Sequence, residues 1–394
     1  MSSYPSIILK AGKERSIQRF HPWVFSGAIQ HTPKGLNEGD LVQVLDSRKK
    51  FLGIGHYQIG SITVRMVAFS DVTVDEAFWK GKIDRAVEAR RAVGLTKKDD
   101  LNVFRLIHGE GDGLPGLIMD YYNGTVVFQA HSVGMYLLKD TFASILKELD
   151  LPITACYNKS AGTIPFKAPI QAEDGFIFGE GDTVEVNEYG SKFTINVVEG
   201  QKTGFFIDQR ESRRLLEEFS KGKKVLNTFC YTGGFSVSAL KAGASEVVSV
   251  DSSQKAIDLT EQIIDLNFGK TEKHTSLCAD AFDYLAKMPD DFDVIVLDPP
   301  AFAKHVRVLE NGLKGYRTIN EKAIKKIKPG GILFTFSCSQ VVSPQDFRTA
   351  VFSAAAATGR EVRILYQVHQ PADHPVSIYH PEGEYLKGLV LQIS

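Results

Sequence analysis

The sequence predicts an α/β protein whose C-terminal half, residues 186–394, forms a doubly wound and mostly parallel β-sheet. The first observation is that short apolar runs alternate with segments of helical periodicity from residue 224 onward. The second is that apolar runs stop abruptly in Asp, Cys or Pro, as residues 295–302 (IVLDPPAF) do. Because ligands of open α/β sheets bind beyond the carboxyl ends of parallel strands, these stops indicate a binding site at that edge.

Length and composition are ordinary for a globular protein of two or three domains. The chain has 394 residues, of which 43% are hydrophobic and 24% are charged. No apolar run approaches the roughly 20 residues that a membrane span needs, and the N-terminus lacks a signal-peptide core. The four cysteines form no C-x-x-C pair, which argues against a zinc site and fits a reducing compartment. We therefore expect a cytoplasmic protein with no membrane partner and no bound metal.

Residues 1–72 are predicted to form a small all-β module, because short apolar runs alternate there with glycine turns. Nine Lys and Arg stand against four Asp and Glu in residues 1–70, although the whole chain has a net charge of −1. A basic module of this kind suits contact with phosphates. A solvated surface explains the same charge equally well.

Residues 73–185 are predicted to form a central α+β domain. Apolar residues recur at helical spacing over 75–95, and a second helix is expected over 135–149. The expected strands lie at 105–108, 116–121, 125–131, 153–158 and 177–178.

The C-terminal half opens with a hairpin and continues with alternating strands and helices, which is the pattern of a parallel sheet. The hairpin strands are expected at 183–186 and 192–197. The later strands are expected at 224–228, 246–251, 276–280, 293–298, 331–336, 361–368 and 386–392. The helices are expected at 234–242, 253–266, 281–287, 314–327 and 344–357.

A glycine-containing turn follows the first strand of the predicted sheet, in residues 227–236 (NTFCYTGGFS). Such a turn lets a ligand approach the backbone and the start of the next helix. It departs from the G-x-G-x-x-G pattern, because Phe229 and Tyr231 replace the earlier glycines. The departure argues against a dinucleotide and allows a smaller ligand such as S-adenosylmethionine.

Acidic residues end the next three strands. Asp251 lies about 20 residues past the turn, where folds of this kind bind ribose hydroxyls. Asp280 could accept a hydrogen bond from an adenine amino group, and Asp298 ends the fourth strand. Alternatively, each acid caps the helix that follows it.

The Asp298-Pro-Pro sequence must leave the sheet, because Pro299 and Pro300 can continue neither a strand nor a helix. A stiff shelf of this kind suits a planar base, with Asp298 facing the edge of the base and Phe302 offering a stacking surface. The alternative is a strained turn without chemistry.

Cys338 follows the fifth strand and lies outside its apolar run, so it need not belong to the core. A thiol would help the methylation of cytosine, whose C5 is a poor nucleophile until a thiolate adds at C6. An acid must stabilise the proton gained at N3, and a base must later remove the C5 proton. Cys338 and Asp298 fit the roles of nucleophile and acid. The group that activates the thiol and the final base are not identifiable from the sequence.

The other cysteines suit this role less well. Cys230 lies within the 227–236 turn, where a structural or cofactor contact is expected. Cys156 and Cys278 are expected in the core.

Several motifs together resemble the class I 23S rRNA (cytosine-C5) methyltransferases. They are residues 201–210 (QKTGFFIDQR), 227–236, 297–304 (LDPPAFAK), 336–339 (FSCS), 372–375 (ADHP) and 385–388 (YLKG). The start of the chain is similar to the PUA RNA-binding domain of that family, and residues 108–116 (HGEGDGLPG) to its central domain. The resemblance implies a Rossmann-like fold, S-adenosylmethionine as donor and 23S rRNA as acceptor.

Carried over by position, the resemblance implies functional residues. The donor pocket would contain Lys202, Thr203, Phe205, Asp208, Asn227, Phe229, Tyr231, Gly233, Asp251, Asp280 and Asp298. Cys338 would be the nucleophile, and the substrate side would contain Pro299, Pro300, Phe302, Lys304 and His374. Larger relatives often carry a second cysteine where this chain has Pro300, so product release cannot use that thiol here.

The leading hypothesis is therefore an RNA methyltransferase that forms 5-methylcytosine in 23S rRNA. One alternative is methylation of an exocyclic amine, adenine N6 or guanine N2, which the Asp-Pro-Pro shelf would serve without any cysteine. Another is a non-catalytic RNA-binding factor in ribosome assembly. Apolar strands of the central domain could form a homodimer interface, which the sequence does not decide.

Overall fold

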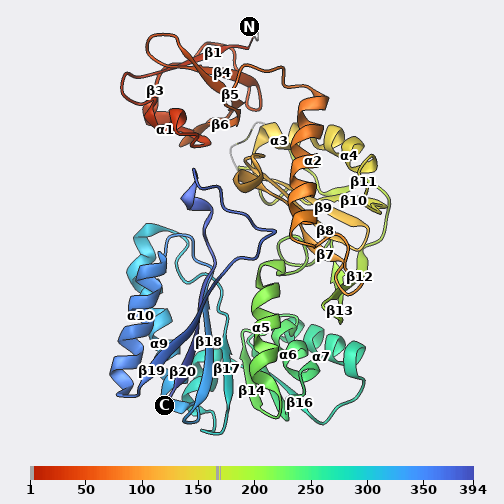
Figure 1. Cartoon of the computed structure of the whole chain (residues 1–394), viewed down its shortest axis with the longest axis vertical. Coiled ribbons are helices and arrows are strands. Elements are labelled where there is room, and N and C mark those ends of the chain that lie inside the picture. Colours follow the sequence, from red (N-terminus) through yellow and green to blue (C-terminus); the bar gives the residue numbers. More distant parts are fainter. Residues whose placement is uncertain (1–3, 166–167, 169) are drawn as a thin grey trace. The chain divides into compact units, whose positions relative to one another are not determined.

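The computed structural model describes residues 4–165, 168 and 170–394 (Figure 1). The chain divides into two compact units. The first is Met1–Asn187 with Thr194–Ile207 and Ala372–Gly383, and the second is Glu188–Phe193 with Asp208–Pro371 and Glu384–Ser394. Among the described residues, no helix is long and apolar enough to cross a membrane. The domain boundaries expected after residues 72 and 185 remain predictions.

The first unit begins with a six-stranded sheet in the order β2-β6-β5-β4-β1-β3. The strands are β1 (Ser6–Leu9), β2 (Trp23–Phe25), β3 (Ile29–His31), β4 (Leu41–Leu45), β5 (Phe51–Tyr57) and β6 (Ile62–Ala68). Two short helices, α1 (Arg15–Gln18) and η1 (Ser26–Ala28), accompany them. Alternate side chains of β1 and β4 are buried, so Ile7, Val42 and Val44 build the core of the sheet. The predicted all-β module is confirmed.

A five-stranded sheet in the order β11-β10-β9-β8-β7 follows. Its strands are β7 (Val103–His108), β8 (Leu117–Tyr122), β9 (Thr125–Ala130), β10 (Ala155–Asn158) and β11 (Gly175–Phe178), with the short helix η2 (Gly109–Asp112) after β7. Helix α2 (Glu76–Ala92) contacts β7. Asp75 is the N-cap of this helix, because its carboxylate accepts a hydrogen bond from the amide of Phe78. The single helix expected over 135–149 is two helices, α3 (Val133–Leu137) and α4 (Lys139–Lys147).

The segment Ala372–Gly383 belongs to the first unit, although it connects β19 (Val362–His369) to β20 (Lys387–Ile393) of the C-terminal sheet. The buried side chain of Arg90 donates hydrogen bonds to both carboxylate oxygens of Asp112, at 2.6 and 2.8 Å. It also donates to the backbone oxygen of Asp373 at 2.7 Å. The sequence assigned this segment to the C-terminal domain, because contacts so distant along the chain leave no local pattern.

A hairpin of β12 (Thr183–Glu188) and β13 (Ser191–Asn196) is shared between the two units. A seven-stranded sheet in the order β16-β15-β14-β17-β18-β20-β19 forms the centre of the second unit. Its remaining strands are β14 (Lys224–Thr228), β15 (Glu246–Asp251), β16 (His274–Cys278), β17 (Val294–Leu297) and β18 (Gly331–Ser337). These five are parallel to one another, and β20 lies antiparallel between β18 and β19. The predicted doubly wound, mostly parallel sheet is confirmed.

Helices pack on both faces of this sheet (Figure 1). They are α5 (Arg210–Ser220), α6 (Gly234–Lys241), α7 (Gln254–Phe268), α8 (Ala281–Lys287), α9 (Leu309–Lys326) and α10 (Pro344–Thr358). One buried cluster joins the sheet to α8, α9 and α10 through Leu285, Ile319 and Phe347. The other joins it to α5 and α6 through Leu216 and Phe235. Three short helices complete the fold: η3 (Ile207–Gln209), η4 (Val306–Val308) and η5 (Pro381–Gly383).

Three expectations for the C-terminal half need correction. The strand expected at 276–280 is β16, which ends at Cys278, and helix α9 begins at Leu309 rather than at residue 314. Cys278 is exposed rather than in the core, because β16 is an edge strand of the sheet. Cys156 is buried as expected.

Candidate active site

The predicted site lies at the carboxyl edge of the parallel strands in the second unit. Thr228 pairs with Leu297 across β14 and β17, and Leu297 pairs with Thr335 across β17 and β18. The loops after these three strands therefore start side by side. The register confirms that Asp298 and Cys338 follow neighbouring strand ends.

The loop after β14 has an unusual backbone. Phe229 and Tyr231 adopt positive φ angles of 56° and 49°, and Gly233 has a φ of 74°. Left-handed conformations cost free energy in residues with a side chain, and they are retained chiefly at functional sites. Phe229 and Tyr231, which stand where a dinucleotide loop has glycines, thus keep a glycine-like backbone.

Asp251 holds this loop in place. Its carboxylate accepts hydrogen bonds from the backbone amides of Tyr231 at 3.1 Å and of Ser253 at 2.9 Å. The side chain is partly exposed, and two of about four acceptor positions on a carboxylate remain for a ligand. Ser253, not Asp251, caps helix α7. Asp251 therefore keeps acceptor positions that suit ribose hydroxyls, and this contact remains a prediction.

Cys230 is a structural residue of the loop. Its side chain is 6% exposed, and its sulfur lies 3.6 Å from the hydroxyl of Thr260. Burial raises the pKa of Cys230 to about 12, so the thiol stays protonated at neutral pH. This geometry argues against Cys230 as a nucleophile.

Asn227 lies near the end of β14, directly before the loop. Its amide nitrogen donates to the hydroxyl of Ser236 at 2.9 Å, and a chain of hydrogen bonds continues through Ser249 to His274. The side-chain oxygen of Asn227 is buried and has no hydrogen-bond partner among the described residues. Asn227 is thus a buried acceptor beside the loop, and its contact with a donor molecule remains a prediction.

Asp280 lies two residues beyond β16 and caps helix α8, because its carboxylate accepts a hydrogen bond from the amide of Asp283 at 3.0 Å. The capping role that the sequence left open is therefore present. An adenine contact by the remaining acceptor positions stays a prediction.

Asp298 is partly exposed and is fixed by Gln209 at the end of η3, whose side-chain amide donates to it at 2.9 Å. The neighbouring Asp208 is buried and accepts a hydrogen bond from the hydroxyl of Tyr385 at 2.8 Å. The hydrogen bonds from Gln209 and Tyr385 therefore fix the orientations of the Asp298 and Asp208 carboxylates. The sequence did not single out Gln209, although it lies within the quoted motif 201–210.

Cys338 is half-buried, and its sulfur lies 4.0 Å from the backbone oxygen of Pro299. The thiol and the Asp-Pro-Pro shelf are thus in direct proximity. Pro299 is buried and Pro300 is exposed, so the chain leaves the sheet at this point as predicted.

Lys387 is a charged neighbour of Cys338 that sequence reasoning missed. Its side chain is 6% exposed, and its ammonium donates to the backbone oxygens of Ser339 at 2.6 Å and Val342 at 2.7 Å. Burial lowers the pKa of Lys387 to about 8, against the opposing influence of the Cys338 and Glu384 charges. The motif 385–388 was the only signal in the sequence that pointed to this residue.

Phe302 lies in an aromatic cluster. Its ring centroid is 4.7 Å from that of Tyr316, 5.8 Å from Phe282 and 6.5 Å from Phe229. It is partly exposed, whereas the nearby Lys304 is exposed. Their contacts with a substrate remain predictions.

Four predicted site residues belong to the first unit. Thr203 is buried and donates to Asp120 at 2.6 Å, Phe205 is 3% exposed, and Lys202 is exposed beside Phe206. His374 is 1% exposed and lies 3.1 Å from the carboxylate of its neighbour Asp373. Thr203 and His374 thus have contacts within this unit, and the ligand contacts expected of these four residues remain predictions.

The carboxyl edge therefore combines a strained loop, an acid with spare acceptor positions and a buried orphan acceptor, which fits an adenosine-bearing donor. Comparison with known proteins adds the decisive observation. The sequence model of the S-adenosylmethionine-dependent methyltransferase family matches residues 169–377, and that of the PUA-like domain matches residues 7–69. The chain belongs to this methyltransferase family.

Relatives that are similar in sequence match almost the whole chain. It is 39% identical over 394 residues to ribosomal RNA large subunit methyltransferase I of Enterobacter sp. (strain 638), covering 98% of this chain and 99% of that one. The protein of the same name from Klebsiella pneumoniae (strain 342) is 37% identical, covering 100% and 99%.

Solved structures show the same fold. A Streptococcus mutans protein superposes on the methyltransferase with a TM-score of 0.83 at 19% identity, covering 98% of this chain and 100% of that one. SMU.776, solved in complex with SAH, superposes with a TM-score of 0.84 at 20% identity and the same coverage. The methyltransferase thus has the Rossmann-like class I fold with an N-terminal PUA-like domain, and S-adenosylmethionine is its cofactor.

Proposed function

We propose that this enzyme methylates C5 of cytosine in the RNA of the large ribosomal subunit, the 23S rRNA, through a covalent adduct with Cys338. The observation that carries the proposal is the proximity of the Cys338 sulfur to the Asp298-Pro299 shelf. The choice of ribosomal RNA is supported by the names of relatives that match almost the whole chain.

The residues at the carboxyl edge supply each group that activates cytosine. The Cys338 thiolate adds to C6 and forms a C–S bond, while Asp298 stabilises the proton gained at N3. S-adenosylmethionine supplies an electrophilic methyl group when it is bound. Loss of the C5 proton then restores the C5–C6 double bond and expels the thiolate of Cys338. Both C5 and C6 must be reachable, so the target base must be unstacked.

We infer that Lys387 activates the thiol of Cys338. A cation beside a cysteine stabilises the thiolate and so favours the nucleophilic form at neutral pH. Because the Lys387 ammonium is held by two backbone oxygens, its charge stays near Cys338 throughout the reaction. We assign it an electrostatic role, distinct from that of the base that takes the C5 proton.

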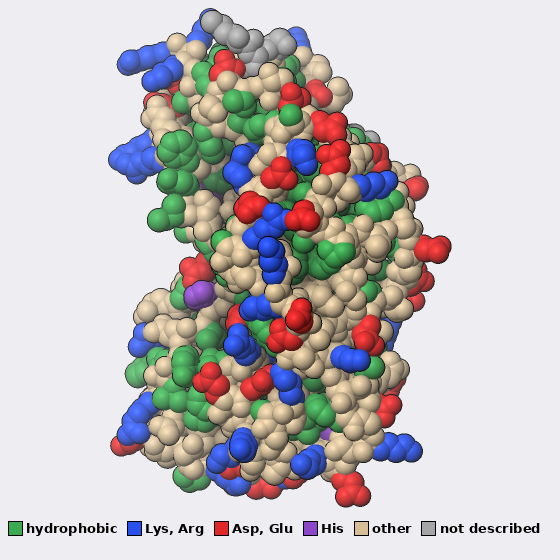
Figure 2. Space-filling view, turned by 45° about the vertical axis from the view of Figure 1, so that its right-hand side comes forward, with side chains coloured by type: hydrophobic (Ala, Val, Ile, Leu, Met, Phe, Trp, Pro, Cys, Tyr) green, Lys and Arg blue, Asp and Glu red, His purple; other side chains and the backbone are tan. Residues whose placement is uncertain are grey.

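The RNA would be held through its phosphates. Acidic and basic side chains are mixed over the face shown in Figure 2, in agreement with a net charge of −1. The excess of basic residues is confined to the start of the chain, where the PUA-like domain lies. A ribosomal substrate also agrees with the cytoplasmic location expected from the sequence, and a homodimer plays no part in the proposal.

The test is transfer of a labelled methyl group from S-adenosylmethionine to protein-free 23S rRNA, followed by nucleoside analysis. We expect 5-methylcytidine from the wild type and at least about 1,000-fold less from Cys338→Ala, because removing a covalent nucleophile costs several powers of ten in rate. Donor binding should be retained in Cys338→Ala.

Cys230→Ala is the matched control, because it also removes a thiol at the carboxyl edge. It should keep the identity of the product and most of the rate. A methylated purine, or full activity of Cys338→Ala, would instead support transfer to an exocyclic amine. Absence of donor binding in the wild type would support the non-catalytic alternative.

A further inference from the structure

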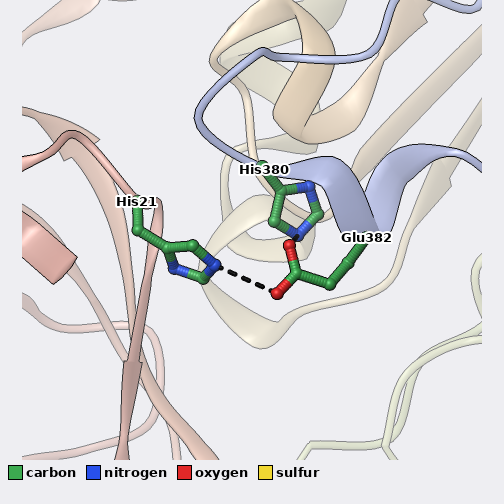
Figure 3. Close-up of side chains that lie close together, drawn as sticks. All are labelled: His21, His380 and Glu382. Atoms are coloured by element: carbon green, nitrogen blue, oxygen red, sulfur yellow. Dashed lines mark hydrogen bonds and ion pairs between the residues drawn. The ribbon is translucent and has the colours of Figure 1, made fainter.

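Three potential metal ligands, none of them among the candidate active-site residues, meet in the first unit (Figure 3). His21 precedes β2 of the PUA-like domain. His380 directly precedes η5 and Glu382 lies within it, both in the segment Ala372–Gly383. One ligand atom from each of the three lies within 4.8 Å of the others. We propose that His21, His380 and Glu382 bind a divalent first-row metal ion, of which Zn²⁺ is the best match.

The distances suit such an ion. Four ligands about 2.1 Å from a tetrahedral zinc lie about 3.4 Å from one another. The Nε2 atom of His21 is 3.3 Å from Oε1 of Glu382, and Nε2 of His380 is 3.8 Å from Oε2 of the same carboxylate. In Figure 3 a ring nitrogen of His21 and one of His380 both lie beside the carboxylate of Glu382, so the three groups converge on one point.

His380 provides the second, independent observation. Its side chain is 3% exposed, and among the described residues neither ring nitrogen has a hydrogen-bond partner. The ion-pair distance of 3.8 Å to Glu382 is too long for a hydrogen bond. Burying an imidazole in this way costs free energy that a metal–nitrogen bond would recover.

The ring of His21 can adopt either tautomer, because its Nδ1 atom lies near both a donor and an acceptor. Its Nδ1 lies 3.2 Å from the backbone nitrogen of Trp23 and 3.4 Å from the backbone oxygen of the same residue. When Nδ1 carries the proton and donates to that oxygen, Nε2 is unprotonated and faces Glu382. This is the arrangement in which metal-binding histidines are usually found.

The surroundings allow an ion to enter and to be retained. The side chain of Glu382 is 45% exposed, whereas His21 is 15% exposed, so one side of the cluster opens to solvent. A water molecule could complete the coordination from that side. The ring of Trp23 packs against His380, with the two ring centroids 4.3 Å apart.

A metal here would tie together parts of the chain that are 361 residues apart. The sequence predicted no metal because that expectation was based on the spacing of the cysteines, and His21 is 361 residues from Glu382 in the chain. The expected effect is to fasten the Ala372–Gly383 segment to the PUA-like domain, as a structural metal does in other folds.

The test uses the full-length, tag-free protein after treatment with a chelator. Zn²⁺ is titrated by calorimetry, and Co²⁺ is used as a probe whose visible spectrum reports nitrogen and oxygen ligation. We expect one ion per chain. His380→Gln and Glu382→Gln should each weaken binding by about 100-fold or more, since changing even an outer partner of a metal ligand costs about 10- to 100-fold.

His31→Gln is the control, because His31 is an exposed histidine of the same sheet. It should bind Zn²⁺ as the wild type does. Hydrogen exchange of residues 377–383 should slow on adding Zn²⁺ to the wild type and not to Glu382→Gln, which alters an exposed side chain and so keeps the fold intact. The proposal is wrong if the wild type binds no stoichiometric ion at micromolar concentration, or if the two ligand variants bind like the wild type.

Discussion

Lys387 lies near Cys338 because β20 runs antiparallel beside β18, with Lys387 opposite Ser337. Its charge is available only in part of the pH range, since burial lowers its pKa to about 8. Below that value Lys387 is an ammonium ion, the form that we propose to stabilise the thiolate, and above it the cation is lost. The activity of the enzyme should therefore fall with rising pH, as Lys387 loses its proton.

We expect kcat/KM for RNA to fall as the pH rises through about 8 in the wild type. In Lys387→Arg the side chain stays charged, because the pKa of arginine is above about 12, so the fall should move to higher pH. A pH–rate profile of both enzymes measures this difference, and Lys273→Arg is the control, because Lys273 is an exposed lysine that precedes β16. An unchanged high-pH limb in Lys387→Arg would contradict the electrostatic role.

The placement of Asp298 and Cys338 was predictable from the sequence, because parallel strands bring the residues that follow them to one edge. The partners that orient or charge them were not predictable. Gln209 reaches Asp298 from 89 residues away, and Lys387 reaches Ser339 from 48 residues away. Such contacts depend on the packing of complete elements and leave no trace in the local pattern.

At the scale of elements, the loop between β14 and α6 combines strain with close packing. A Cβ atom at Gly233 would lie 2.8 Å from Cγ2 of Thr260, and the φ angle of Gly233 is 74°. Thr260 in turn donates to the backbone oxygen of Tyr231 at 2.9 Å. A side chain at position 233 would thus displace the part of the loop proposed to bind the donor.

Gly233→Ala should lower the free energy of unfolding by more than Gly222→Ala does. Gly222 has a similar φ of 71°, but no atom lies within 4 Å of its potential Cβ. The control should lose only about 1 kcal/mol for the left-handed backbone, and Gly233→Ala should lose about 1–3 kcal/mol more for the clash. Urea denaturation checks the stabilities, and calorimetry should show weaker S-adenosylmethionine binding for Gly233→Ala alone. Equal losses in both variants would exclude the steric contribution.

The buried Arg90 joins α2 to η2 and to the Ala372–Gly383 segment. Arg90→Ala leaves the carboxylate of Asp112 buried without its partner, so the free energy of unfolding should fall by about 3–5 kcal/mol. Arg91→Ala is the control, because Arg91 pairs with the exposed residues Glu88 and Asp150 and should cost less than about 1 kcal/mol. Denaturation curves that coincide for the two variants would refute this assignment.

At the scale of the whole molecule, the sequence predicted the three kinds of architecture but not the path of the chain between the two units. The alternation of strands and helices is a local pattern, and it was sufficient for the seven-stranded sheet. The Ala372–Gly383 segment contacts residues such as Arg90, 283 positions earlier. Sequence periodicity carries no information on docking of that kind.

RNA binding by the whole protein should weaken with salt, because contacts with phosphates release counterions. Arg48 and Lys50 are exposed in the basic PUA-like domain. The double variant Arg48→Ala/Lys50→Ala should reduce the slope of log affinity against log salt by about 1–2. Lys270→Ala/Lys273→Ala is the control, because these exposed lysines precede β16, at the edge of the sheet opposite the site. A salt-independent affinity would argue against phosphate contacts.

The central claim is the covalent adduct between Cys338 and cytosine, and trapping it is the most direct test. In RNA that contains 5-fluorocytidine, C5 carries fluorine instead of hydrogen, so after methyl transfer no C5 proton can be removed to expel the thiolate and the adduct should persist. We predict that mass spectrometry of the digested wild-type enzyme will find the nucleotide on the peptide that contains Cys338. Formation of 5-methylcytidine from ordinary RNA without any trapped adduct, or an adduct on another cysteine, would contradict the account.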